Sequence, residues 1–103
     1  MNIGYTRQAR PDDNETHEHQ RTKITRAFAI DHWYSDVAPG SEIGRKGLQE
    51  LITFCERNPY PGSADNWGRV VASSADRIGA SPKWLIDLAT RLARHGWLLV
   101  SLE

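Results

Sequence analysis

At 103 residues the chain has the length of a single domain, which can bury enough apolar surface to fold without disulfides. Thirteen Lys and Arg residues balance thirteen Asp and Glu residues, whereas dedicated nucleic-acid-binding proteins usually carry a clear positive excess. The single cysteine, Cys55, excludes an intramolecular disulfide, and no apolar run is long enough for a signal peptide or a membrane span. These features predict a reduced, cytoplasmic protein.

Residues 1–23 are the most polar part of the chain. After Tyr5 they contain almost no large apolar side chains, and their charges of both signs follow neither a helical nor a strand period. A segment that buries little apolar surface cannot offset the entropy lost on ordering. We therefore expect a flexible N-terminal arm at 1–23 and a single folded domain at 24–103.

The opening letters MNIGYTR resemble the first strand of serine recombinases. No catalytic serine follows them in a matching context, and the chain shows no alternation of strands and helices. Membership of that family is therefore not expected.

The region from Lys23 to Tyr34 is rich in aromatic and β-branched residues, which favours a strand, although a short helix fits the pattern nearly as well. A helix is predicted from about Arg45 to Arg57, before the helix-breaking letters NPYPG. Its apolar stripe consists of Leu48, Leu51, Ile52 and Cys55.

Two further helices and a final strand are expected. A second helix would follow the letters GSADN and end at Gly79, with a buried face of Val70, Val71, Ala75 and Ile78. The third is the clearest, because Ser81 is a favoured N-cap, Pro82 suits the first helical position and Gly96 follows a basic last turn. The letters WLLVSL after Gly96 have the composition of a strand.

The corner between the second and third helices resembles the helix-turn-helix of small bacterial and phage DNA-binding regulators. Ala75, Gly79, Leu85 and Leu88 stand at the spacing of that motif, with the glycine in its left-handed turn, and the resemblance covers about Arg69 to Arg91. It implies that the helix Pro82–His95 reads the major groove of double-stranded DNA. The implied DNA-binding residues are Ser81, Lys83, Asp87 and Thr90 near the bases, and Arg69, Arg77, Arg91 and Arg94 at the phosphates.

The expected fold class is thus mainly α, a three-helix, winged-helix-like domain with one or two short strands. The expected function is a non-enzymatic transcriptional regulator, acting as a dimer on half-sites. The alternative is a phage-encoded inhibitor or adaptor that binds a host protein, because Asp87 carries the wrong charge for DNA and four tryptophans suit an interface. Trp67, Trp84 and Tyr60 are the candidate residues for that partner.

Neither catalysis nor a cofactor is expected from the side chains. Ser73, Ser74 and Cys55 lie in no recognisable nucleophile motif. The histidines and Cys55 show no spacing typical of a closed zinc site. These observations predict a protein that is not an enzyme and needs neither metal nor membrane.

Overall fold

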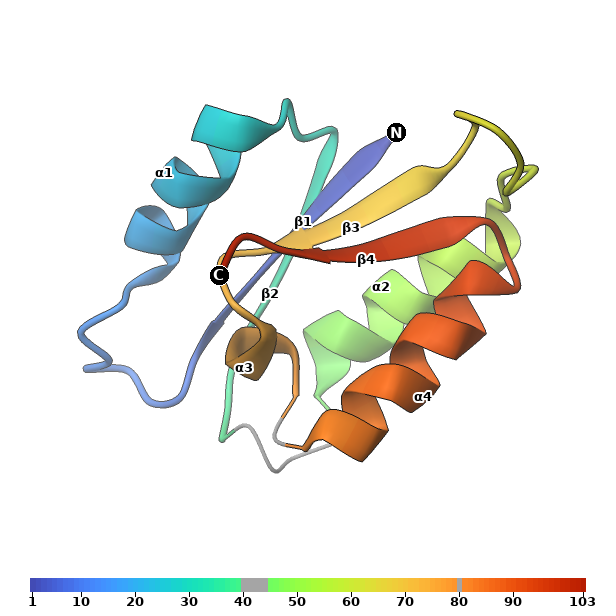
Figure 1. Ribbon diagram of the computed structural model, residues 1–103. Coiled ribbons are helices and arrows are strands. Elements are labelled where there is room, and N and C mark those ends of the chain that lie inside the picture. Colours follow the sequence, from blue (N-terminus) through green and yellow to red (C-terminus); the bar gives the residue numbers. More distant parts are fainter. Residues whose placement is uncertain (40–44, 80) are drawn as a thin grey trace.

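The computed structural model describes residues 1–39, 45–79 and 81–103, and it contains a four-stranded parallel sheet with the order β2-β1-β3-β4 (Figure 1). The strands are β1 (Asn2–Gln8), β2 (His32–Val37), β3 (Gly68–Ala72) and β4 (Trp97–Ser101). The helices are α1 (His17–Ala27), α2 (Lys46–Arg57), α3 (Ala75–Ile78) and α4 (Pro82–Ala93). The fold is therefore α/β, and the expected mainly α, helix-turn-helix fold was wrong.

The helices cover both faces of the sheet, as parallel strands require. Helix α1 packs on one face, while α2 and α4 lie together on the other (Figure 1). The main core fills the space between the sheet and the α2–α4 layer. Its fully or almost fully buried apolar side chains are Ile3, Tyr5, Leu48, Leu51, Ile52, Cys55, Val70, Ala72, Ile78, Leu88, Leu92 and Trp97.

The predicted helix-turn-helix corner is a different structure. Val70 and Val71, expected on a helix, lie in strand β3, and α3 is a single turn of four residues. Gly79 has an extended backbone with φ −155°, so it does not make the left-handed turn of the motif. A glycine is nevertheless needed there, because a Cβ atom would lie 2.2 Å from the ring of Trp84. Gly79 stands at the spacing of the helix-turn-helix motif because α4 packs closely on the loop that contains it.

The segment predicted as a flexible arm contains the strand that joins the two halves of the sheet. Strand β1 pairs with β2 on one side and β3 on the other, and most of its side chains are buried. The polar side chains were misread because they are hydrogen-bonded in the fold, partly to other residues of the same segment, such as Thr6 to His17, and partly to residues far along the chain, such as Asp13 to Arg77. Helix α1 starts at His17, where the Thr16 side chain accepts a hydrogen bond from the His19 amide.

The expected helix at 45–57, the third helix and the final strand correspond to α2, α4 and β4. The ambiguous region from Lys23 to Tyr34 contains both structures, since it holds the end of α1 and the start of β2. Within the described parts of the chain, no helix is long and apolar enough to cross a bilayer.

Candidate functional site

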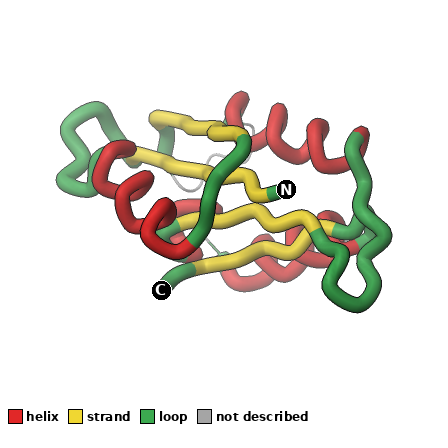
Figure 2. The backbone as a smooth tube through the Cα atoms, turned by 90° about the horizontal axis from the view of Figure 1, so that it is seen from above, coloured by secondary structure: helices red, strands yellow, loops and turns green. Residues whose placement is uncertain are grey.

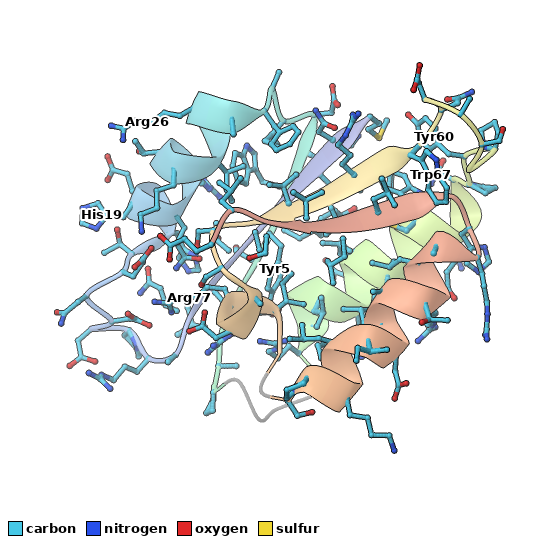
Figure 3. All side chains as sticks on the ribbon, in the orientation of Figure 1. Tyr5, His19, Arg26, Tyr60, Trp67 and Arg77 are labelled. Carbon is cyan, nitrogen blue, oxygen red and sulfur yellow. The ribbon has the colours of Figure 1, made fainter. Side chains whose placement is uncertain are left out.

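Three arginines meet at the edge of the sheet where the parallel strands end. Arg7 lies near the end of β1, Arg45 immediately precedes α2, and Arg77 lies in α3. The region around Arg77 is at the lower end of the sheet in Figure 3, below Tyr5. The carboxyl edge of an open parallel sheet is the usual place for a ligand site. We call Arg7, Arg45 and Arg77 the arginine site.

Two of these guanidinium groups are almost inaccessible and are held by backbone carbonyls. The Arg7 side chain, in a residue 5% exposed, donates to the carbonyls of Arg77 (3.1 Å), Asp76 (2.7 Å) and Ala38 (2.8 Å). Arg45, which is 3% exposed, donates to the carbonyls of Arg77 and Ile78. Carbonyl groups orient a guanidinium but leave its positive charge without a counter-charge.

The electrostatics of the arginine site favour a negatively charged ligand. Burial, followed by the nearby charges of Arg45 and Arg77, lowers the pKa of Arg7. The Nε atom of Arg45 is buried and has no hydrogen-bond partner among the described residues. An unsatisfied buried donor costs free energy, which an acceptor atom of a ligand would recover. The charge and the free donor of the described site therefore suit an anion.

Arg77 already has an anionic partner within the chain. Its Nη1 atom lies 2.8 Å from Oδ2 of Asp13 and its Nη2 atom 3.4 Å from Oδ1, in a fork-to-fork arrangement. Asp13 belongs to the loop between β1 and α1, residues 9–16, which we call the strap. Hydrogen bonds from Arg77 and from the amides of Ala9 and Glu15 hold the pKa of Asp13 far below its usual value.

A second network positions Arg45. The carboxylate of Asp36, at the end of β2, accepts hydrogen bonds from the amides of Gly47 (2.8 Å) and Leu48 (2.9 Å) and so caps α2. It also accepts from the Tyr5 hydroxyl at 2.7 Å. The Tyr5 ring lies 5.7 Å from Cζ of Arg45, and burial raises the pKa of this tyrosine above its usual value. Tyr5 and Asp36 together fix the start of α2 and the arginine before it.

On the opposite face of β1, polar side chains fasten the strap to the sheet. Gln20 of α1 is fully buried; its side chain accepts from the Arg7 amide and donates to the carbonyls of Arg7 and Glu15. The Gln8 side chain accepts from the His17 amide and donates to strap carbonyls. The Thr6 hydroxyl pairs with His17 Nδ1 at 2.7 Å, and burial lowers the pKa of that histidine.

The residues predicted to bind DNA are spread over the molecule. Helix α4 begins at the carboxyl edge, so Ser81 and Lys83 lie at the same end as Arg77, whereas Asp87 and Thr90 are further along the helix. Arg91 pairs with Glu56, Arg94 ends α4, and Arg69 packs over Phe28. Only Arg77 belongs to the arginine site. The part that each of the eight residues takes in DNA binding stays a prediction.

The predicted protein-contact residues do not form one patch. Tyr60 and Trp67 lie in the loop between α2 and β3, at the far end of the sheet from Arg77 (Figure 3). Trp84 is half-buried near the start of α4 and packs against Gly79. Their role in partner binding likewise stays a prediction.

Sequence reasoning missed Tyr5, Arg7, Asp13, Asp36 and Arg45. A signal was present in the first of these, because Ile3, Tyr5 and Arg7 alternate with smaller or polar residues as in a strand. The polar residues at the ends of successive strands can be recognised as one site only after the strands have been placed. No group of three or more metal-ligating side chains occurs in the described residues.

Among the described residues, the serines near this edge include Ser81, the N-cap of α4. The strap carries none, since its letters are ARPDDNET. Among the described residues, Ser73 and Ser74 follow β3 directly. Ser73 is buried with an unpartnered hydroxyl, while the half-buried Ser74 donates to the carboxylate of Asp76.

Comparisons with known proteins identify the family and the fold. The sequence matches the family described as "Resolvase, N terminal domain" over residues 2–103. No curated protein sequence gives a match. Solved structures with the same fold include the C-terminal catalytic domain of ISC1926 TnpA, an IS607-like serine recombinase, with TM-score 0.79 and 20% identity. A serine recombinase from Sulfolobus solfataricus has TM-score 0.80 and 19% identity, and the N-terminal catalytic domain of TP901-1 integrase has 0.79 and 18%.

Each of these alignments covers 99% of the present chain, but 67%, 67% and 78% of the respective structures. The family match corrects several predictions. A helix-turn-helix regulator of transcription was wrong, the alternative of a phage inhibitor is not supported, and the rejection of the serine recombinase resemblance was wrong. The expectation of a non-enzymatic protein was also wrong at the level of the family, whose members cleave and exchange DNA strands. The chain belongs to the resolvase N-terminal domain family.

Proposed function

We propose that the chain acts on DNA as a resolvase-type catalytic domain and that the arginine site receives a phosphodiester of the DNA backbone. The observation that carries the proposal is the buried Nε of Arg45, which has no partner among the described residues; next to it, the buried guanidinium of Arg7 meets backbone carbonyls and, in the described part of the chain, no carboxylate. Guanidinium groups match the oxygens of a phosphate through forked hydrogen bonds. Such contacts position a protein on DNA without reading its sequence.

The balanced total charge of the chain does not exclude this function. Binding a phosphodiester depends on the local charge at the site, and the site concentrates three cations at one edge. Where a phosphoryl group is transferred, arginines that contact its oxygens stabilise the charge of the transition state. Arg7 and Arg45 are rigidly held before any ligand arrives, which is the preorganisation that such stabilisation needs.

Strand cleavage of the kind named for serine recombinases requires a serine hydroxyl. The hydroxyl oxygen attacks phosphorus, the bond to the leaving strand oxygen breaks, and that oxygen takes up a proton. Because the strap lacks a serine, an attacking hydroxyl would have to come from another segment of the chain. Mass spectrometry of a peptide linked to DNA, after reaction with a nicked substrate that cannot religate, would identify it.

Binding is tested with duplex DNA by fluorescence anisotropy over a series of salt concentrations. Arg45→Gln should weaken binding at least ~10-fold at low salt, because one phosphate contact and its preorganised charge are lost. Arg57→Gln is the matched control, since it removes the same charge from the exposed last turn of the same helix. Equal loss in both variants, with both folded by circular dichroism, would contradict the assignment.

We also propose that the chain forms a homodimer. Sedimentation equilibrium with and without duplex DNA would measure the oligomeric state.

A further inference from the structure

The arginine site is partly filled by the protein itself. Asp13 of the strap and Arg77 are both largely buried, with side chains 13% exposed, and they meet in the forked geometry that a phosphate would use. Arg77 also donates to the Arg7 carbonyl at 2.9 Å, so the pair lies against the base of the arginine site. The carboxylate of Asp13 thus stands where an anionic ligand of Arg77 would bind.

Each oxygen of the Asp13 carboxylate has two partners, Arg77 and a backbone amide of the strap. Oδ2 accepts from Arg77 and from the Ala9 amide at 2.8 Å, while Oδ1 faces Arg77 and accepts from the Glu15 amide at 2.9 Å. The two amides lie near opposite ends of the strap. Moving the carboxylate away from Arg77 would therefore loosen both ends of the strap together.

We propose that Asp13 is an internal competitor of the DNA phosphate: it holds the strap closed on Arg77, and the phosphate displaces it. This inference rests on the proposed phosphodiester function of the arginine site. Displacement would give Arg77 to the ligand and would free residues 9–16, which directly follow the central strand, to rearrange next to the bound DNA. The strap then couples occupancy of the site to the conformation of the loop beside it.

The matched control for Asp13 lies next to it. Asp12 is in the strap as well, but it is exposed and pairs with the exposed Arg10 at 2.8 Å. Asp13→Asn and Asp12→Asn make the same change in net charge. We expect Asp13→Asn to bind a short duplex at least ~5-fold more tightly than the wild type, since a neutral amide competes poorly with phosphate for Arg77. Asp12→Asn should change the affinity less than ~2-fold.

A second measurement needs no variant. Hydrogen exchange of the Ala9 and Glu15 amides in the wild-type protein should become faster when saturating duplex is added, because their acceptor leaves. Equal affinities of the two variants, weaker binding by Asp13→Asn, or unchanged exchange on DNA binding would each overturn the inference while leaving the phosphodiester function in place. Failure of every form, including the wild type, to bind duplex would overturn both.

Discussion

The two edges of the sheet are built from opposite kinds of side chain. At the carboxyl edge, Arg7 and Arg45 are almost fully buried and the Asp13–Arg77 pair is largely buried. At the amino edge, where the strands begin, aromatic rings pack on one another. Figure 2 shows the corresponding loops, residues 9–16 and 58–67, at opposite ends of the molecule.

The amino edge is closed on itself. Trp97, fully buried at the start of β4, has the ring of Tyr60 at 5.2 Å and that of Phe54 at 6.3 Å, both edge-on. Its indole N–H donates to the Asn58 carbonyl at 3.0 Å. Gly96 turns the chain here with φ +79°, and a Cβ atom would collide with the Tyr60 carbonyl. The ring contacts, the indole hydrogen bond and the glycine turn are all explained by the packing of this edge.

The carboxyl edge is not explained by packing alone. Burying a charged guanidinium carries a desolvation cost, and a buried Nε without a partner among the described residues adds to it. Buried rings at the amino edge stabilise the fold, whereas we propose that the buried arginines at the carboxyl edge bind a ligand. Substitutions at the two edges should therefore separate stability from DNA binding.

The largest effect on stability is expected at the amino edge. Trp97→Ala should lower the free energy of unfolding by about 3–5 kcal/mol, because it empties the centre of the aromatic cluster. Urea denaturation measures the loss. Below the unfolding transition, the affinity of the folded protein for duplex should change less than ~2-fold. A large loss of affinity in a sample that is still folded would show that the two edges are coupled.

An intermediate effect on stability, joined to a loss of binding, is expected for Asp36→Asn. The first turn of α2 loses a charged cap, which should cost about 1–2 kcal/mol in thermal or urea denaturation. The affinity for duplex should also fall, since Arg45 loses its positioning network. Asp65→Asn, in an exposed loop at the other edge, is the control with the same charge change. Unchanged affinity in a destabilised Asp36→Asn protein would show that this network stabilises the fold but does not contribute to DNA binding.

The smallest effect concerns pH. The pKa of Asp13 is lower in the folded protein than in the unfolded chain, so its pairing stabilises the fold above a pH of about 4. That contribution, about 1–2 kcal/mol, is lost as the pH falls below 4 and the carboxylate takes up a proton. The wild type should thus lose its stability advantage over Asp13→Asn in acid, as urea titrations at several pH values would show. A constant difference between pH 7 and pH 3 would argue against the pairing.

The regular half of the fold could be predicted from the sequence. Helix α2 carries an apolar stripe and ends before prolines, and α4 has a serine cap, a proline and a closing glycine. Strand β3 was read as a helix because Val70, Val71, Ala75 and Ile78 share a helical spacing, although the chain changes structure after Ala72. Spacing alone does not distinguish one helix from a strand followed by a short turn.

The first quarter of the chain and the site were missed for one physical reason. In α1 only Gln20 and Ile24 are buried, so the sequence has no apolar stripe that would indicate a helix. In β1 the buried residues include Thr6, Arg7 and Gln8; Thr6 and Gln8 are hydrogen-bonded to His17 of the next helix, and Arg7 to Asp76 far along the chain. Such compensation exists only in the folded structure. From the sequence alone, a polar segment whose side chains are hydrogen-bonded in the fold is therefore easily mistaken for a flexible arm.

The most direct test of the phosphodiester site is an NMR measurement of the arginine side chains. The Nε–H resonance of Arg45 should shift strongly when a short duplex is added at low salt, because this buried donor gains a phosphate acceptor, and the Nε–H of Arg57 should not move. Saturable DNA binding with an unchanged Arg45 resonance would place the phosphate elsewhere and contradict the central claim.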